Sequence, residues 1–180
     1  MKIFLSGGCK NGKSYYAQHL AKSQNKGLMY YVACMRPVDG EDEERIKRHR
    51  DEREGWGFLT VEQHVDIEKI LDISDSGGSF LLDSTTALLA NEMFLLDGSV
   101  NENAADKIIE GLCQILAEIQ DIVIISDYIY SDAVIYEPLT EKYRESLAKI
   151  DKYLAKHCDV VLEVVNTQII THKGYIHEIN

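Results

Sequence analysis

GGCKNGKS, residues 7–14, stands between an apolar run at residues 3–5 and a stretch of helix-forming residues. It fits the pattern G-x-x-x-x-G-K-[S/T] at every fixed position. In this pattern the glycines let backbone N–H groups turn inward around an anion, in backbone conformations that other residues avoid. The helix that follows points the positive end of its dipole at the same anion. A tight turn before a helix is the simpler alternative. With a strand over 3–6 and a helix over 13–23, however, the stretch predicts a nucleotide-binding phosphate loop.

Two side chains of this stretch have distinct predicted roles. Lys13 would reach the β- and γ-phosphates of a nucleoside triphosphate, and the hydroxyl of Ser14 would bind Mg²⁺. We therefore expect Mg²⁺ as a cofactor. The residues expected to surround the phosphates are Gly7, Gly8, Cys9, Lys10, Asn11, Gly12, Lys13 and Ser14.

Length and composition limit the class of protein. The chain has 180 residues, of which 45% are hydrophobic and 27% charged. These values are ordinary for a globular protein, and the length predicts one domain over 1–180 with a substantial core. The formal net charge is −11. This charge argues against nucleic acid or an anionic membrane as the main partner, but a nucleotide stays possible because a phosphate site needs only local positive charge.

The cysteines and the start of the chain indicate a compartment. Cys9, Cys34, Cys113 and Cys158 form no C-x-x-C pair. They are typical of reduced thiols in the cytosol rather than of a disulfide framework or a zinc site. The sequence starts directly with the predicted strand and has no recognisable signal peptide, and no apolar run approaches the length of a membrane span. We therefore expect a cytoplasmic protein without a membrane span.

Apolar runs alternate with helix-like segments along the rest of the chain. Runs rich in Val, Ile and Leu predict strands over 28–33, 79–82, 122–126 and 160–165. Near-continuous apolar strands are typical of a parallel sheet buried on both faces. Helices are expected over 85–96, 103–119 and 139–157, and a closing hairpin over 168–179 with Lys173-Gly174 between its halves. The alternation predicts an α/β layered sandwich with a mostly parallel central sheet and a C-terminal β-hairpin.

One predicted helix, over 41–53, does not fit a core. Ile46 is its only apolar residue. Arg45, His49 and Arg53 are four residues apart and therefore line one helical face. A histidine between two arginines could receive a polyphosphate. The alternative is a solvated helix held by ion pairs, in which the histidine is incidental.

The phosphate loop is followed by a specific series of motifs. The series consists of Tyr31-Val32-Ala33, the string Arg45-Ile46-x-x-His49-x-x-x-Arg53, Trp56, Thr60-Val61-Glu62 and a strand ending Leu81-Leu82-Asp83 before Thr85-Thr86. Together with the loop, it resembles the family of adenosylcobinamide kinase/adenosylcobinamide-phosphate guanylyltransferase, a bifunctional enzyme of cobalamin biosynthesis. The resemblance spans most of the first half of the chain and implies a P-loop NTPase-like fold.

The resemblance implies two activities in one transferase. The kinase phosphorylates the aminopropanol hydroxyl of adenosylcobinamide with ATP or GTP. The guanylyltransferase then moves GMP from GTP onto that phosphate through a covalent GMP–histidine intermediate, which gives adenosylcobinamide-GDP. The resemblance also implies a homo-oligomer, a trimer with active sites near subunit boundaries, from which the polar helix projects.

The resemblance also assigns roles to residues. By position, His49 matches the guanylylated histidine, and we expect it to be catalytic together with Lys13 and Asp83. A histidine nucleophile needs a neutral imidazole nitrogen aimed at the α-phosphate, and flanking arginines would stabilise the charge that develops on the phosphoryl oxygens. The positions that match nucleotide contacts of the family are Ala33, Cys34, Met35, Arg50, Asp51, Glu52, Arg53, Glu62 and Asp83.

Three carboxylates have roles that the residues themselves suggest. Asp83 ends a core strand, where it would bind Mg²⁺ together with Ser14, or alternatively cap a turn. Asp127 also ends a strand and is a rival ligand for the metal. Glu62 could accept hydrogen bonds from N1–H and N2–H₂ of guanine, or could simply be an exposed carboxylate at a strand edge.

The second half of the chain resembles the family less closely. Where family members carry Asn-Glu-Val-Gly and further glycines, residues 126–132 read SDYIYSD. A changed loop could alter the corrinoid that is accepted or remove one activity. Tyr128, Tyr130 and Tyr136 could line a pocket for a large flat ligand or cover a sheet edge. Two other functions stay open: a P-loop kinase for another small alcohol, and a non-catalytic nucleotide-binding switch.

Overall fold

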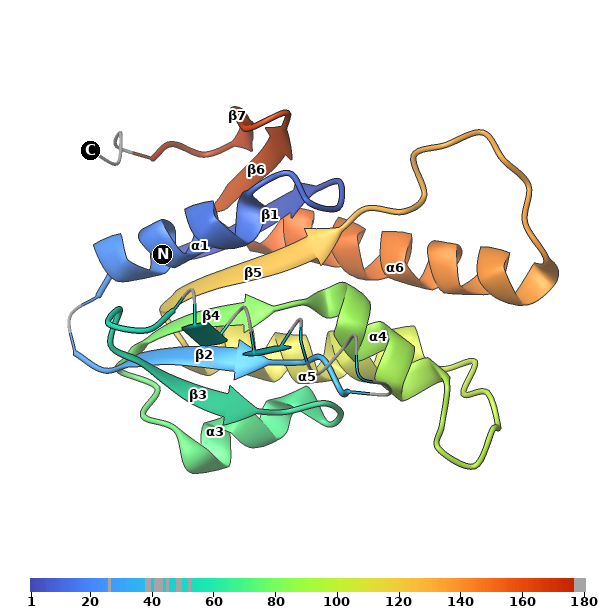
Figure 1. The fold of residues 1–180 in the computed structure, drawn as a ribbon, viewed down its shortest axis with the longest axis horizontal. Helices are drawn as coiled ribbons and strands as arrows, with labels where there is room; N and C mark the ends of the chain where they lie inside the picture. The colour runs from blue at the N-terminus through green and yellow to red at the C-terminus, as the bar shows by residue number, and fades with distance from the viewer. Residues whose placement is uncertain are drawn as a thin grey trace.

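The computed structural model describes residues 1–25, 27–37, 40, 44, 46, 47, 50, 51 and 53–176. Within these residues, seven strands form one sheet with the order β3-β2-β4-β5-β1-β6-β7 (Figure 1). The strands are β1 (Lys2–Gly7), β2 (Met29–Ala33), β3 (Phe58–Glu62), β4 (Ser79–Asp83), β5 (Asp121–Asp127), β6 (Val160–Val165) and β7 (Gln168–Lys173). The helices are α1 (Lys13–Ser23), the short 3₁₀ helix η1 (Ile67–Lys69), α3 (Ile70–Ile73), α4 (Thr85–Met93), α5 (Ala104–Glu118) and α6 (Pro138–His157).

The sheet is parallel except at one edge. β1 pairs in parallel with β5 on one side and with β6 on the other. β5 pairs with β4, so that one strand separates β1 from β4. Only β7 runs antiparallel to its neighbour, β6. The carboxyl ends of β1, β4 and β5 therefore meet at one edge of the sheet, where open α/β sheets bind their ligands.

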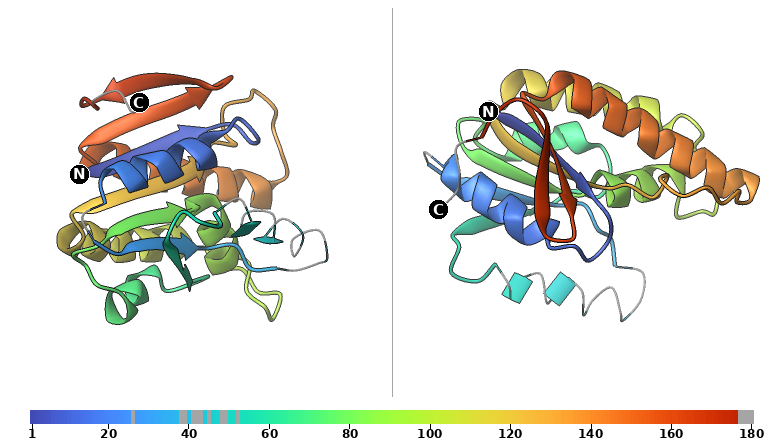
Figure 2. Two further views of the ribbon diagram at one scale, coloured as in Figure 1. Left: turned by 60° about the vertical axis from the view of Figure 1, so that its left-hand side comes forward. Right: turned by 90° about the horizontal axis from the view of Figure 1, so that it is seen from above.

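The strands alternate their side chains between two cores. On one face Ile3 and Leu5 pack with residues of α1. On the other face Phe4 and Phe80 pack with residues of α4, α5 and α6. Figure 2 shows α1 on one face of the sheet and α5 and α6 on the other. Because successive side chains of a strand point to opposite faces, burial on both sides requires the continuous apolar runs seen in the sequence.

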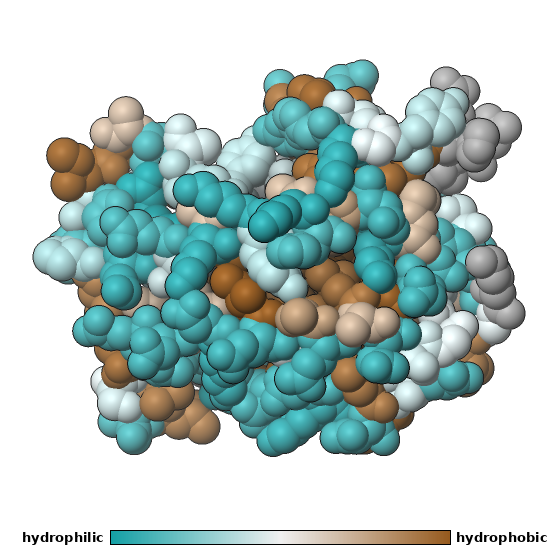
Figure 3. Space-filling model, turned by 180° about the vertical axis from the view of Figure 1, so that it is seen from behind, coloured by the Kyte–Doolittle hydropathy of each residue, from teal (hydrophilic) through white to brown (hydrophobic). Residues whose placement is uncertain are grey.

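The helices on the second face are amphipathic. Ile108, Leu112 and Ile115 of α5 are fully buried and recur at helical spacing. Seen from behind, the outer surface of this layer is mostly hydrophilic, with apolar atoms mainly in a strip across the middle and in small groups at the periphery (Figure 3). Among the described residues, no helix is both long and apolar enough to cross a bilayer.

The predicted elements are largely confirmed. The helix expected over 13–23 is α1, and the four predicted apolar strands are β2, β4, β5 and β6, each within one residue at either end. The helix expected over 85–96 is shorter, because α4 ends at Met93 and Phe94 forms an isolated antiparallel bridge with Val100. Strand β3 was not predicted. Its residues are exposed or half-buried, so it lacks the apolar run that marks the other strands.

The C-terminal hairpin is confirmed, but its predicted turn is wrong. The turn lies at Asn166 and Thr167, both with positive φ, and joins β6 to β7. Gly174, which the sequence placed at the turn, follows the end of β7. Its φ is +75° and a Cβ atom there would lie 2.4 Å from the carbonyl oxygen of Asp159, so the glycine serves a close backbone approach.

The polar segment over 41–53 is described only in part. Gly40, Glu44, Ile46, Lys47, Arg50 and Asp51 have helical backbone. Arg45, His49 and Glu52 lie outside the described residues, so the predicted face of Arg45, His49 and Arg53 stays a prediction.

Candidate functional site

The phosphate loop joins β1 to α1 at the carboxyl edge of the sheet. Gly12 precedes the first residue of α1 with φ +88°, a conformation that L side chains rarely adopt, which explains the glycine. No side chain caps this helix start. Apart from the Lys13 N–H, which donates to the Asn11 side chain, the backbone N–H groups of the first turn of α1 are therefore left for a ligand, as in other anion sites at helix N-termini.

The loop is fixed to the neighbouring strand β6. The side-chain amide of Asn11 donates to the carbonyl oxygen of Val164 at 2.6 Å, and its oxygen accepts from the backbone N–H of Lys13 at 3.3 Å. A Cβ atom on Gly7 would lie 2.5 Å from the Asn11 amide nitrogen and 2.7 Å from the Val164 oxygen. Any larger residue at position 7 would therefore push the loop away from β6.

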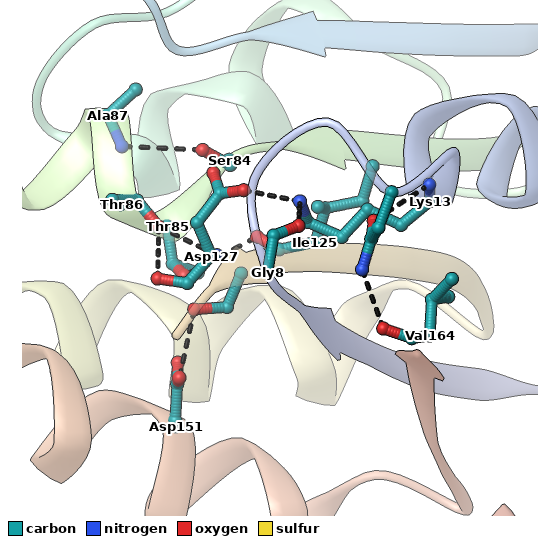
Figure 4. Close-up of polar contacts among 12 residues, drawn as sticks. Gly8, Lys13, Ser84, Thr85, Thr86, Ala87, Ile125, Asp127, Asp151 and Val164 are labelled. Carbon is teal, nitrogen blue, oxygen red and sulfur yellow. Dashed lines mark hydrogen bonds and ion pairs between the residues drawn. The ribbon is translucent and has the colours of Figure 1, made fainter. Parts of the chain in front are cut away.

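Lys13 folds back over the loop. Its side chain is only 5% exposed, and Nζ donates to the carbonyl oxygen of Gly8 at 2.9 Å. Nζ also forms an ion pair with the carboxylate of Asp127, which follows the buried run of β5 (Figure 4). The ammonium is thus held between the loop and the end of β5, the place where a bound polyphosphate would need a cation.

Asp83 has a different set of partners. Tyr31 Oη donates to Asp83 Oδ2 at 2.6 Å, and the guanidinium carbon of Arg53 lies 3.5 Å from the centroid of the Tyr31 ring. Burial, and then the nearby Asp83 carboxylate, raise the pKa of Tyr31 well above its ordinary value, so it stays a hydrogen-bond donor at neutral pH. Arg53 is 8% exposed. The Arg53–Tyr31–Asp83 chain joins the polar segment to the edge of the sheet.

The donor set at this edge suits a hard cation. Ser14 is the second residue of α1 and is half-buried, and Asp83 is half-buried at the end of β4. Mg²⁺ is usually held by one or two carboxylate or hydroxyl oxygens together with substrate phosphates and water. Among the described residues no group of three or more His, Cys, Asp or Glu could form an all-protein metal cage. The residues present therefore fit Mg²⁺ that arrives with a nucleotide.

A second region of predicted contacts lies beside β3. A cavity of about 590 Å³ is lined by residues that include Arg50, Asp51, Arg53 and Thr60. Arg50 Nη2 lies 3.6 Å from Glu62 Oε1, and both side chains are exposed. Arg50, Arg53 and Glu62, which the sequence assigned to nucleotide contacts, therefore lie near one another.

The predicted contact residues at the end of β2 and just after it differ in how exposed they are. Ala33 and Met35 are half-buried, whereas the Cys34 thiol is fully buried, and burial raises its pKa above the ordinary range. The Cys34 carbonyl oxygen accepts from Asn91 Nδ2 at 2.8 Å. Its backbone N–H donates to the Asp83 carbonyl oxygen at 2.9 Å. In the single chain the thiol and both backbone groups of Cys34 are thus occupied within the protein, which the sequence pattern could not distinguish.

Comparison with protein families assigns the chain. A family model described as cobinamide kinase / cobinamide phosphate guanyltransferase matches residues 3–171. The chain belongs to this family. The match extends through the second half, which the sequence motifs alone left weakly supported. No curated protein matches the chain.

Solved structures share the architecture of this cobinamide kinase/guanyltransferase family member. The flagellar accessory protein FlaH from Methanocaldococcus jannaschii is 16% identical with a TM-score of 0.53, covering 96% of this chain and 77% of that one. A Pyrococcus horikoshii OT3 protein, PH0250, is 11% identical with a TM-score of 0.54, covering 99% of this chain and 88% of that one. At these identities the likeness shows the fold alone, and the P-loop NTPase-like sandwich is confirmed.

In this family member, three residues have contacts that the sequence pattern does not predict. Asp127, expected as a rival metal ligand, is the acidic partner of Lys13. Thr86, on α4, accepts from the backbone N–H of Asp127 at 2.9 Å and fixes the end of β5. Asp151 of α6 is 4% exposed and accepts from Ser126 Oγ at 2.9 Å. The one sequence signal was that Asp127 ends an apolar run, as Asp83 does.

The β5–α6 loop (residues 128–137) is held by one buried cation. Arg144 of α6 donates to the carbonyl oxygens of Ile129 at 3.1 Å and Val134 at 3.0 Å. It also pairs with the carboxylates of Asp132 at 2.8 Å and Glu141 at 2.7 Å. This one side chain thus ties several points of the loop that departs from the family pattern to α6, together with Glu141, which accepts from the Tyr136 backbone N–H at 2.8 Å.

The three tyrosines predicted to form a pocket in this region have different partners. Tyr130 Oη donates to Asp151 Oδ2 at 2.7 Å and borders a cavity of about 300 Å³ beside α6. Tyr136 lies under the Arg144 guanidinium, 4.7 Å from ring centroid to guanidinium carbon, and donates to Asp132 at 3.0 Å. Neither Tyr128 nor Tyr136 lines the cavity that Tyr130 borders. The rings of Tyr128 and Tyr130 are neighbours, with centroids 6.5 Å apart, but the three rings do not line this cavity together.

Proposed function

We propose that this protein phosphorylates the alcohol of adenosylcobinamide with ATP or GTP and then transfers GMP from GTP to the product, which gives adenosylcobinamide-GDP. Membership of the family supports the substrate class. The observation that carries the proposal is the buried Lys13 ammonium, held over an uncapped helix start between Gly8 and a strand-end carboxylate.

In the kinase step, the chain binds and orients the triphosphate. The backbone N–H groups of the phosphate loop and of the first turn of α1 hold the β-phosphate, and Lys13 neutralises charge on the β- and γ-phosphates. Ser14 and Asp83 would hold Mg²⁺, which when bound neutralises the charge that builds up on the phosphate oxygens. Tyr31 keeps the Asp83 carboxylate in one orientation.

In the guanylyltransferase step, His49 is the proposed nucleophile. A neutral ring nitrogen attacks the α-phosphorus of GTP, a P–N bond forms, and the bond to the leaving pyrophosphate breaks. The phosphate of the acceptor then attacks the same phosphorus and releases the histidine. We propose that Arg50 and Arg53 stabilise the phosphoryl oxygens and that Glu62 accepts hydrogen bonds from guanine. Ala33, Cys34, Met35, Asp51 and Glu52 complete the proposed nucleotide contacts.

We propose further that one domain over 1–180 carries both steps, that it acts in the cytoplasm, and that it assembles as a homo-oligomer. The resemblance implies a trimer. Arg50, Glu62 and the cavity beside β3 are exposed in the single chain, which suits a site completed near a subunit boundary.

Intact-protein mass spectrometry after incubation with GTP and Mg²⁺ tests the proposal. We expect a mass gain of one GMP in the parent that His49→Ala lacks. His157→Ala is the matched control, since His157 is exposed at the end of α6 and its Nδ1 lies 3.0 Å from the Tyr153 carbonyl oxygen of the same helix. An adduct in both His49→Ala and the parent would assign a different nucleophile. GTP binding without any adduct would contradict the guanylyltransferase half.

A kinase without guanylyltransferase activity is the second candidate. It is favoured by the β5–α6 loop, which lacks the family's glycines and is instead fixed by Arg144. We propose that this loop contributes to the choice of acceptor. Phosphorylation of cobinamide by a protein that forms no GMP adduct would support this candidate. Phosphorylation of another small alcohol in preference to cobinamide would assign that alcohol as the substrate.

A further inference from the structure

We propose that Asp127 is the catalytic base of the phosphoryl-transfer step and that Lys13 holds it in place until a nucleotide binds. The inference rests on the proposed kinase activity. It assigns to Asp127 a role distinct from that of Asp83, although both carboxylates end neighbouring parallel strands at the same edge of the sheet.

The position of Asp127 is fixed by the strands and by α4. In the parallel register of β1 and β5, Asp127 stands opposite Gly7, the residue at which the phosphate loop begins. Thr86 Oγ1 accepts from its backbone N–H at 2.9 Å. The carboxylate pairs with Lys13, whose Nζ also contacts Gly8. Figure 4 shows Lys13, Gly8 and Asp127 converging at the mouth of the loop.

The ion pair implies an exchange of partners. The ammonium of a phosphate-loop lysine is needed by the β- and γ-phosphates, so a bound triphosphate draws Lys13 toward itself. The carboxylate in direct contact with that ammonium is then left beside the γ-phosphate without its cation. A carboxylate in this position can accept a hydrogen bond from a hydroxyl that approaches the γ-phosphate, which is the geometric requirement for a general base.

Asp83 is less suited to accept that proton. One of its oxygens already accepts from Tyr31 Oη at 2.6 Å, under the stacked Arg53. Asp83 stands opposite Ile125 in the register, two residues before Asp127. The Asp83 carboxylate is held by a neutral donor and lies near a cationic side chain, so it is suited to bind a metal ion. Asp127 instead loses its partner, Lys13, when the nucleotide binds. The two environments separate the two roles.

The acceptor hydroxyl gives its proton to the Asp127 carboxylate as its oxygen forms a bond to the γ-phosphorus. The bond from that phosphorus to the β–γ bridging oxygen breaks, and its electron pair leaves with the nucleoside diphosphate. Asp127 later releases the proton to water. In the absence of an alcohol, a water molecule can take the place of the hydroxyl, which gives slow release of phosphate.

Asp127→Asn tests the assignment, with Asp127→Glu as the conservative variant and Asp106→Asn as the control. Asp106 is an exposed carboxylate of α5 that pairs with Lys149. ATP binding is measured by calorimetry. Single-turnover transfer of the γ-phosphate to cobinamide and to water is followed with the enzyme in excess over ATP, at concentrations at which all of the ATP is bound. We expect Asp127→Asn to bind ATP at least as tightly as the parent, because no carboxylate competes for Lys13. We expect its transfer rate to fall about 100-fold or more, the usual contribution of a general base.

The other variants sharpen the result. Asp127→Glu should transfer phosphate at least tenfold faster than Asp127→Asn, and Asp106→Asn should match the parent. A transfer rate for Asp127→Asn within threefold of the parent would overturn the assignment, as would equal rates for the Asn and Glu variants. So would weaker ATP binding by Asp127→Asn, or a rate that recovers when Mg²⁺ is raised tenfold, since either indicates a role in holding the nucleotide or the metal.

The outcomes also separate this inference from the proposed function. If the parent transfers phosphate to water but not to cobinamide, the proposed substrate is wrong, and the effect of Asp127→Asn on hydrolysis still decides the role of Asp127. If the parent binds ATP but transfers phosphate to neither acceptor, both proposals are overturned.

Discussion

The phosphate loop and the β5–α6 loop leave the same edge of the sheet but are held in opposite ways. The phosphate loop is short, polar and fixed by its own Asn11 and Lys13, and no N-cap side chain occupies the start of α1. The β5–α6 loop is longer and is fixed by Arg144, which reaches in from α6. Several of its exposed residues are apolar, with Ile135 at 91%. The phosphate loop thus leaves space for a ligand, whereas the β5–α6 loop encloses the Arg144 side chain.

This contrast separates two requirements of a kinase. Phosphate binding needs a fixed backbone geometry, which the glycines and Asn11 impose. Recognition of an acceptor needs a surface whose side chains can differ while the path of the chain is kept, and a buried arginine that contacts several points of the loop helps to keep it. Most of the stretch that departs from the family pattern, residues 128–132, lies in the second kind of loop.

The largest expected effect comes from removing the internal anchor. Arg144→Met keeps most of the side-chain volume but leaves the Ile129 and Val134 carbonyl oxygens without this donor. Loss of a buried, multiply hydrogen-bonded cation costs about 3 kcal/mol of unfolding free energy. Denaturant unfolding measures it. Lys152→Met is the control, because Lys152 lines the same cavity beside α6 as Arg144. ATP affinity should stay within threefold of the parent. A stable Arg144→Met protein would show that the loop does not depend on this residue.

Removing the phosphate-loop cation should lower ATP affinity and leave the stability of the fold almost unchanged, the reverse of the effect expected for Arg144→Met. In Lys13→Met we expect ATP affinity to fall about 100-fold, because one charge-assisted contact to the phosphates is lost. The unfolding free energy should change much less, since Asp127 is partly exposed and can take up water. Calorimetry measures the ATP affinity, and denaturant unfolding measures the free energy of unfolding. Lys22→Met, on the same helix and over the Trp56 ring, is the matched control. An ATP affinity of Lys13→Met within threefold of the parent would show that Lys13 does not contact the phosphates.

Much of this contrast could be read from the sequence, and some could not. The pattern of residues 7–14 and the apolar runs gave the loop, α1 and four strands, because these are local features. The Lys13–Asp127 pair could not be predicted, since it depends on β5 lying between β1 and β4, and local sequence does not encode strand order. Lys173-Gly174 suggested the wrong turn because a glycine needed for close approach looks like a turn glycine. His49 lies outside the described residues, so its role stays a prediction.

The smallest expected effect concerns Asp151, which lies behind the end of β5. Burial raises the pKa of Asp151 from 3.8 to about 6. The folded state therefore keeps this proton to higher pH than the unfolded state, and the parent loses stability as pH rises from about 4 to about 6. Asp151→Asn lacks this titration and can still accept from Ser126 or Tyr130. We expect its unfolding free energy, relative to the parent, to improve by about 2 kcal/mol between pH 4 and pH 7.

Denaturant unfolding at several pH values measures that difference. Asp106→Asn, which removes an exposed carboxylate, controls for the change in net charge. Because the other titrating groups are shared, they cancel in the comparison with the parent. A difference that is constant with pH would show that Asp151 has no raised pKa in the folded protein.

The order of the strands has a consequence for how this chain is made. β1 pairs only with β5 and β6 among the described strands, and both lie in the last third of the sequence. A ribosome therefore releases the glycine-rich loop more than a hundred residues before its supporting strands. Until residue 127 emerges, Lys13 has no carboxylate to pair with and β1 has no neighbour. The nucleotide site, although encoded first, is completed late, and contacts of such long sequence separation slow folding.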